Sequence, residues 1–477
     1  MTDGVYDPTS LVVGCVPLNL FGGPGSVTQD QYDYVGAVLT DHRATRLYQV
    51  EGTIGGTAFA LPGGDMSWAL TGGWGKQSFT YSPDSAKASF DVTGNKGLGT
   101  NGSLTVFSGG LEVLLPFFDN GSQSFDMSAS LRYDDYDELN DGEATYQVGF
   151  EFQAIENLKF RGTAGTVFRA PTIEDLYQGR YDNFPTFKDP CKTLPLAAGC
   201  AQQSTQPDNQ VLTVNSGNPT LKPETGETYT IGAVWTPRVG PGNLSLTLDY
   251  WQIDLKDAIS SFGIQKILDD CYIDQVASAC ANVTRSSAYI VTRVVDDLLN
   301  VAEQGAKGVD FEARYGWDTN LGQFDASLLW AHMLERTKKG FPAAPTEDLS
   351  GRFTDPTAQD GGAYPTDKIN YDLKWTWNAL SITYMGEYIS SLDADTFCNC
   401  GTGNRPDGSY IQKIDSYLYH DLVGSYDFGQ GTRLSAGVTN LTDEEPPFIE
   451  VGFNATTDPA TYRVMGRGYF VRLSHKF

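Results

Sequence analysis

The sequence predicts an all-β protein, an antiparallel up-and-down β-barrel that crosses a membrane with about fifteen strands. Fifteen segments alternate apolar and polar side chains with a period of two, as strands with one apolar face do. The connections between these segments alternate between short and long along the chain. The chain also ends on such a segment, 469–477, and the last strand of a membrane barrel is the one that closes the ring.

The strands are expected wherever the alternation persists. In residues 125–133, Phe125, Leu131 and the positions between them at every second residue are apolar, whereas Asp126 and Arg132 belong to the polar set. Most segments have nine to twelve residues, which is the length that a tilted strand needs to cross a bilayer. In chain order they are 45–58, 66–78, 103–115, 125–134, 144–153, 157–168, 226–236, 243–255, 308–316, 323–334, 370–377, 380–388, 417–428, 432–440 and 467–477.

The lengths of the connections distinguish the two ends of the barrel. In an up-and-down barrel, alternation places every short turn on one side and every long loop on the other, as in outer-membrane barrels. We expect the C-terminus on the short-turn, periplasmic side. With an odd strand count, residues 1–44 then form a loop region on the opposite, extracellular side, and 45–477 form part of a barrel. Because bacterial single-chain barrels have an even number of strands, we expect the front of this barrel to be missing from the sequence.

The composition fits this fold class and excludes others. The chain has 477 residues, of which 40% are hydrophobic, and no run approaches the 18 apolar residues of a transmembrane helix. The net charge of −26 argues against nucleic acid as a partner. The N-terminus has neither the basic segment nor the apolar segment of a secretory signal, so we expect no such signal there.

The cysteines predict local disulfides in an oxidising compartment. Cys191 and Cys200 are nine residues apart, as are Cys271 and Cys280, each pair within a polar irregular stretch. A zinc site would require closer cysteine pairs or nearby histidine. The remaining cysteines leave alternatives open: Cys398 and Cys400 either bridge each other or pair elsewhere, and Cys15 is left over.

Several motifs resemble one family. Phe160-Arg-Gly-Thr-Ala-Gly-Thr-Val-Phe-Arg-Ala-Pro-Thr172 resembles the barrel signature of TonB-dependent outer-membrane receptors. Asn218-Pro-Thr-Leu-Lys-Pro-Glu-Thr225 is similar to the segment that opens that family's next strand, and Val438-Thr-Asn-Leu-Thr-Asp443 to a later one. The signature residues are Phe168, Arg169, Ala170, Pro171, Asn218, Pro219, Leu221, Pro223, Glu224, Asn440 and Leu441.

The resemblance implies a 22-stranded barrel in the outer membrane with an N-terminal plug in its lumen. It implies uptake of a scarce small-molecule nutrient, an iron–siderophore, cobalamin or an oligosaccharide, with energy from the TonB complex acting through the plug. We find no plug-like segment and seven strands too few, so the resemblance covers the later part of such a receptor. The implied partners are outer-membrane lipid and the barrel-assembly machinery, which we expect to read the terminal strand through Tyr469, Val471, Leu473 and Phe477.

The end of the signature and the loop that follows it carry a strand stop and a group of aromatic residues. Pro171 lacks an N–H and restricts Ala170 to extended geometry, so we expect the strand to stop there, with Arg169 paired to Glu174 or Asp175. The loop aromatics Tyr177, Tyr181, Phe184 and Phe187 are candidates for stacking on a ligand, or for forming the loop's own small core.

Other functional classes receive less support. The sequence contains neither a metalloprotease motif nor a nucleophile elbow, so we expect no enzyme, no metal site and no cofactor. The alternatives are a smaller, complete porin-like passive channel and a secreted β-protein that binds glycans.

Overall fold

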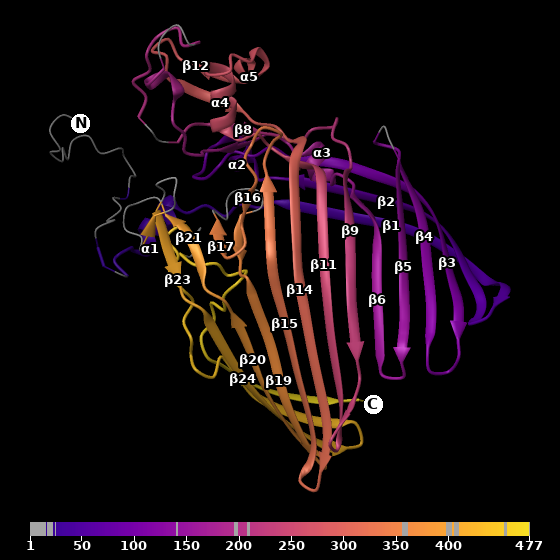
Figure 1. Cartoon of the computed structure of the whole chain (residues 1–477). Helices are drawn as coiled ribbons and strands as arrows, with labels where there is room; N and C mark the ends of the chain where they lie inside the picture. The colour runs from indigo at the N-terminus through magenta and orange to yellow at the C-terminus, as the bar shows by residue number, and fades with distance from the viewer. Residues whose placement is uncertain are drawn as a thin grey trace.

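One large antiparallel sheet dominates the computed structural model, which describes residues 16, 22–23, 25–139, 142–194, 199–207, 210–354, 361–396, 403–404, 410–452 and 456–476. Each main strand pairs with the next one along the chain (Figure 1). The main strands are β1 (His42–Leu61), β2 (Gly64–Ser82), β3 (Thr100–Asp119), β4 (Ser124–Tyr136), β5 (Glu143–Ile155), β6 (Leu158–Arg169), β9 (Glu224–Trp235), β11 (Gly242–Ser260), β14 (Leu299–Thr319), β15 (Gly322–Lys339), β19 (Asp367–Trp377), β20 (Leu380–Ile389), β24 (Tyr417–Gly429), β25 (Thr432–Thr439) and β26 (Gly468–His475). All fifteen predicted strands are confirmed, and the short strands β10 (Arg238–Val239) and β16 (Glu347–Asp348) complete a sheet of 17.

The sorting of the connections is also confirmed. The tight hairpins lie at one end of the sheet and the long connections at the other (Figure 1). The C-terminal strand ends among the tight turns, where the Lys476 N–H donates to the Gly431 carbonyl oxygen at 2.9 Å. We call the end with the long connections the mouth.

Several strands continue further toward the mouth than their alternation predicts. β15 continues to Lys339 instead of residue 334, and its pairing with β14 passes from Met333 opposite Gly308 to Glu335 opposite Lys307, so that Leu334 is an extra residue in β15. Such a bulge inserts a residue and exchanges the two faces, so alternation is lost although the backbone stays paired. The period-two test therefore stops at the bulge while the strand continues.

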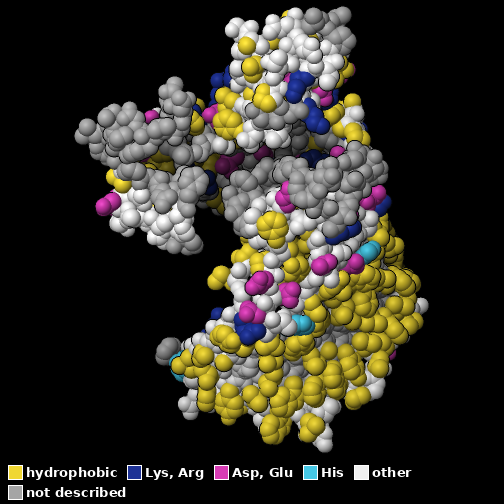
Figure 2. Space-filling model, turned by 90° about the vertical axis from the view of Figure 1, so that its left-hand side faces the viewer, with side chains coloured by type: hydrophobic (Ala, Val, Ile, Leu, Met, Phe, Trp, Pro, Cys, Tyr) yellow, Lys and Arg dark blue, Asp and Glu magenta, His cyan; other side chains and the backbone are white. Residues whose placement is uncertain are grey.

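The outer face of the sheet is apolar over a broad area. Leu131 of β4 lies opposite Leu111 of β3 and Tyr146 of β5, and its side chain is 56% exposed. Ala129, Val113 and Val148 form the next row in the same way. Figure 2 shows the surface that such rows create, with charged side chains gathered above it toward the mouth. An apolar face of this kind suits lipid and not water.

The inner face carries polar and charged residues. The Arg161 guanidinium on β6 donates to the Asp249 carboxylate on β11 at 3.0 and 2.7 Å, across the intervening strand β9. Gly232 of β9 lies in register with both residues, and a Cβ there would lie 1.9 Å from Asp249 Oδ1. Glycine at this position therefore allows a side-chain bridge over the strand.

The sheet is open at both edges in the part of the chain that the structure describes. β1 pairs only with β2, and β26 pairs only with β25. The terminal strand therefore has an open edge, whereas the smaller complete channel would need a closed ring. Tyr469, Val471 and Leu473 form the exposed apolar face of β26, and Phe477 lies outside the described residues.

Smaller elements lie in the N-terminal region and the connections. They are α1 (Gln29–Val35), α2 (Ser85–Ser89), α3 (Ile173–Tyr177), β7 (Tyr181–Asn183), η2 (Pro190–Lys192), β8 (Thr213–Asn215), α4 (Ile264–Tyr272), α5 (Ala277–Ala281), β12 (Val283–Arg285), β13 (Val291–Val295), β17 (Arg352–Thr354), β18 (Gly362–Tyr364), β21 (Leu392–Thr396), β22 (Gly403–Asn404) and β23 (Tyr410–Ile414). None of the described helices combines the length and the apolar character needed to span a membrane.

Candidate functional site at the mouth

Two long connections fold together into one module, which we call the loop cap (residues 173–218 and 261–298). Strands β7 and β8 come from the first connection, and β12 and β13 from the second. β8 and β13 pair in parallel, with Val294 opposite Thr213, and so join both connections in one small sheet, β7–β8–β13–β12. The module stands at the mouth, above the ends of the strands (Figure 1).

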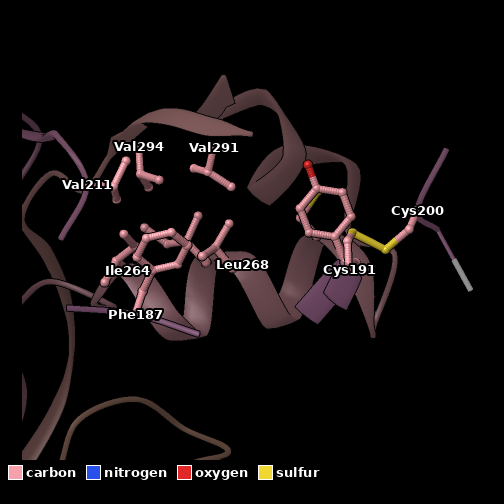
Figure 3. Packing of buried hydrophobic residues seen from close by; sticks show 11 residues of the cluster. Phe187, Cys191, Cys200, Val211, Ile264, Leu268, Val291 and Val294 are labelled. Carbon is pink, nitrogen blue, oxygen red and sulfur yellow. A yellow bond between two sulfur atoms is a disulfide. The ribbon is translucent and has the colours of Figure 1, made fainter. Parts of the chain in front are cut away.

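The loop cap has its own apolar core. Ile264, Ile267, Leu268 and Cys271 of α4 follow the spacing of one helix face, and all four are buried. Figure 3 shows this face packed against the two valines of β13 and the ring of Phe187 from the other connection. Phe187 therefore contributes to the core of the module, which is the second of the two roles considered for it.

Both nine-residue cysteine pairs are disulfides, as their spacing predicts. Cys191 bonds to Cys200 and Cys271 bonds to Cys280, with Cα–Cα distances of 5.6 and 4.6 Å. Each bond closes a short loop within one connection, so neither joins the two connections covalently. Cys15, Cys398 and Cys400 lie outside the described residues.

A buried ion pair joins the two connections instead. The Arg285 guanidinium donates to both oxygens of Asp189 at 2.6 and 2.8 Å, and the two side chains are 7% and 1% exposed. The Tyr272 and Tyr289 rings each lie 4.5 Å from the guanidinium carbon. Burial alone would raise the pKa of Asp189, but the bonds from Arg285, Ser204 and the Cys191 N–H outweigh it and lower that pKa. No local sequence pattern reveals this pair, because 96 residues separate its partners.

The signature arginine organises the rim below the loop cap. Arg169 ends β6, and its guanidinium donates to both oxygens of Glu224 at 2.7 and 2.6 Å and to Asp175 at 3.0 Å. Asp175 is one of its two expected partners, whereas Glu224 is a partner that the sequence does not predict. Glu224 is nearly buried and also accepts the Ile259 N–H at 2.7 Å, so it links three neighbouring strands.

The other signature residues support the same rim. β6 stops at Arg169, just before Ala170 and Pro171, as the proline predicts. The Asn218 side chain donates to the Leu298 carbonyl oxygen at 2.8 Å, and Leu221 packs into a buried cluster with neighbours from α3 and β11. Pro223 is buried and Pro219 is exposed, while the Phe168 ring meets Tyr136 edge-on at 6.5 Å.

The remaining loop aromatics are partly buried. Tyr177 packs over Gly102, where a Cβ would lie 2.4 Å from its ring, so it fills the rim cluster. Tyr181 and Phe184 are half-buried, and burial raises the pKa of Tyr181. Contact of these residues with a ligand stays a prediction.

Asn440 and Leu441 begin the connection between β25 and β26. Asn440 is 1% exposed, and its side chain bonds to the backbone of Glu444 as both donor and acceptor at 2.9 Å. The Leu441 N–H donates to the His420 carbonyl oxygen at 2.7 Å. These contacts give the two residues a structural role at the start of this connection.

Known proteins share this architecture. A crystal structure of the ferric enterobactin receptor PfeA from Pseudomonas aeruginosa superposes with a TM-score of 0.61 at 16% identity, over 91% of this chain and 55% of that one. The siderophore receptor PirA from Acinetobacter baumannii gives a TM-score of 0.57 at 16% identity, over 92% and 55%. In sequence, the vitamin B12 transporter BtuB of Photobacterium profundum is 24% identical over 348 residues, which is 73% of this chain and 40% of that one.

This chain therefore spans about half the length of the proteins that it resembles. The family model described as "TonB dependent receptor-like, beta-barrel" matches residues 15–441. Members of this family are transport proteins of the outer membrane and not enzymes. Together with the open sheet and its loop cap, this match shows that the chain belongs to the TonB-dependent receptor family and represents its β-barrel.

Proposed function

We propose that this chain is the C-terminal barrel portion of an outer-membrane receptor that takes up a scarce nutrient with energy from the TonB complex. The nutrient is an iron–siderophore, cobalamin or an oligosaccharide. The names of the relatives support metal chelates, since they include receptors for siderophores and a transporter of vitamin B12. The remaining length of the whole receptor would supply the plug through which the TonB complex acts, and residues 1–44 would lie on the extracellular side.

The loop cap is the observation that carries this proposal. A passive pore gains little from a preorganised module at its mouth, whereas a receptor that captures a dilute ligand does, because ordering is completed before binding. Here, two connections are held in one conformation by a shared sheet, a buried ion pair and two disulfides. Aromatic side chains of the first connection, Tyr181 and Phe184, are half-buried and can contact a ligand from the module.

Uptake in cells tests the proposal. The whole gene, including the region upstream of residue 1, would be expressed in cells with and without TonB. Accumulation of labelled ferric siderophores, cyanocobalamin and malto-oligosaccharides would then be measured. We expect one class to accumulate only when TonB is present.

The alternatives give different results. Equal uptake with and without TonB would identify a passive channel and overturn the proposal. A protein found in the culture medium, without heat-modifiable mobility in the membrane fraction, would support a secreted glycan-binding protein instead.

A further inference from the structure

The connection between β25 and β26 lies against the inner face of the sheet. We call its described residues, 440–452 and 456–467, the strap. We propose that the strap is the movable part of the mouth, that Arg463 holds it closed, and that the loop cap stays rigid when it opens. This inference does not depend on which nutrient is transported.

Arg463 fixes the strap to two strands of the inner wall. Its guanidinium donates to Glu387 of β20 at 3.2 and 2.9 Å and to Asp421 of β24 at 2.8 and 3.0 Å. The guanidinium also lies 4.9 Å from the centre of the Tyr419 ring. In register, Glu387 pairs with Tyr419 and Asp421 pairs with Met385, so these residues share the face opposite the outward His420 and Leu418.

The two ends of the strap are tied together at its base. Asp421, which binds Arg463 near the end of the strap, also accepts the N–H of Asn440 at its beginning, at 2.8 Å. Asp443 accepts the Arg467 N–H at 2.7 Å. The strap can therefore move as a closed loop about this base without disturbing the pairing of β25 with β26.

Apolar residues hold the middle of the strap. Ile449, Val451 and Tyr462 are buried in one cluster with Ile389 of β20 and with residues of the small sheet formed by β17, β18, β21, β22 and β23. The Tyr462 hydroxyl lies in this cluster without a hydrogen-bond partner among the described residues. A buried hydroxyl without a partner destabilises the closed strap relative to an open strap, in which water can bond to the hydroxyl.

The anchor of the strap is weaker than that of the loop cap. Side chains of Arg463, Glu387 and Asp421 are 33%, 25% and 14% exposed, so water and salt screen their attraction. The corresponding pair in the loop cap is almost fully buried and is supplemented by disulfides. The strap contains no cysteine. Water and salt therefore weaken the ion pairs that hold the strap more than they weaken the ion pair of the loop cap.

The inner wall carries an alternative ion-pair partner for Arg463. Beside it lies a pocket of about 370 Å³, lined among others by Asp372, Asn370 and the ion pair of Glu312 with Arg314. Asp372 accepts a hydrogen bond from Ser327 and forms no ion pair with a described cation. Exchange of Arg463 from Glu387 and Asp421 to Asp372 would release the strap while keeping the guanidinium paired.

Amide hydrogen exchange on the full chain in detergent micelles tests the proposal. We expect Arg463→Gln to accelerate exchange in peptides from 440–452 and 456–467 by about tenfold, equivalent to about 1.4 kcal/mol. Peptides from 264–281 in the loop cap should not change. Arg433→Gln is the matched control, because Arg433 forms an exposed pair with Asp427 outside the strap.

A salt titration of the unmodified chain provides a second test that needs no folded variant. At about 1 M sodium chloride the Debye length falls to about 3 Å, and exchange in the strap should approach that of Arg463→Gln. Exchange in the strap that changes less than about twofold under both perturbations overturns the proposal. Equal acceleration in the loop cap also overturns it, because the opening would then be global.

Discussion

Breaking the buried ion pair of the loop cap should open the module locally. The Asp189 side chain is 1% exposed, and in Arg285→Met its carboxylate loses both of its charged hydrogen bonds. Arg285 also donates to the Tyr272 hydroxyl at 2.8 Å and to the Tyr289 carbonyl oxygen at 2.6 Å, and both contacts disappear with it.

The magnitude follows from the burial of the pair. Removing one partner of a buried ion pair costs about 3–5 kcal/mol, because the other charge stays desolvated. The stacking on two aromatic rings adds about 0.5–2 kcal/mol each, although these contributions overlap. We therefore expect the free energy of opening the loop cap to fall by about 4 kcal/mol at neutral pH.

The effect should decrease as the pH falls. The pKa of Asp189 is lowered in the folded chain, so its stabilisation is present at neutral pH and is lost as pH falls through that pKa. In the variant, the loss of Arg285 shifts the pKa of the same carboxyl upward, so protonation of the group costs the variant less stability than it costs the unmodified chain. The free energies of opening the loop cap in the two proteins should therefore become equal in acid.

Amide exchange of α4 measures the local opening, and a double-mutant cycle isolates the pair. Asp189→Asn keeps an oxygen for the Cys191 N–H, so it removes the charge with little change in shape. We expect the double variant to be at least about 2 kcal/mol more stable than the sum of the single effects predicts. Arg433→Met, in an exposed pair, should cost less than about 1 kcal/mol.

One result would refute this reasoning. If Arg285→Met lowered the opening free energy by less than about 1 kcal/mol, and the two substitutions were additive, the pair would behave like an exposed ion pair. The loop cap would then owe its integrity to its apolar core and disulfides alone.

Three further predictions concern the two faces of the sheet and the loop cap. Leu131→Arg should cost about 2–4 kcal/mol if the outer face meets lipid near the midplane, whereas Ser128→Arg on the inner face should cost much less; equal tolerance in urea unfolding from vesicles would contradict this orientation. Gly232→Ala should cost about 1–3 kcal/mol, because its Cβ collides with the opposing carboxylate, while Gly109→Ala, with nothing within 4 Å, should be nearly neutral in the same assay. Burial raises the pKa of Asp296, so its ionised form opposes folding at neutral pH and this penalty disappears as pH falls; Asp296→Asn should slow exchange in the loop cap at pH 7 more than at pH 4, and the reverse order would disprove this assignment.

Local sequence determined where the strands lie and where β6 ends. Alternation within 125–133 depends only on neighbouring residues, since each side chain of a strand points to the face opposite that of the next residue. The end of β6 follows from Pro171, which has no N–H to continue the ladder. The disulfides of the loop cap were predictable because the two cysteines of each pair are only nine residues apart.

Only the tertiary structure decided which distant side chains meet. Arg169 binds Glu224, 55 residues away, because β9 pairs with β6 in a register that places these two residues opposite each other. The ion pairs of Arg285 and Arg463 depend in the same way on how two loops pack against elements from other parts of the chain. Register and loop closure are set by the sum of many weak contacts across the sheet, and no short window of sequence contains that sum. A period of two therefore reveals a strand and its faces, but the partners of its charged ends emerge only when the strands are assembled.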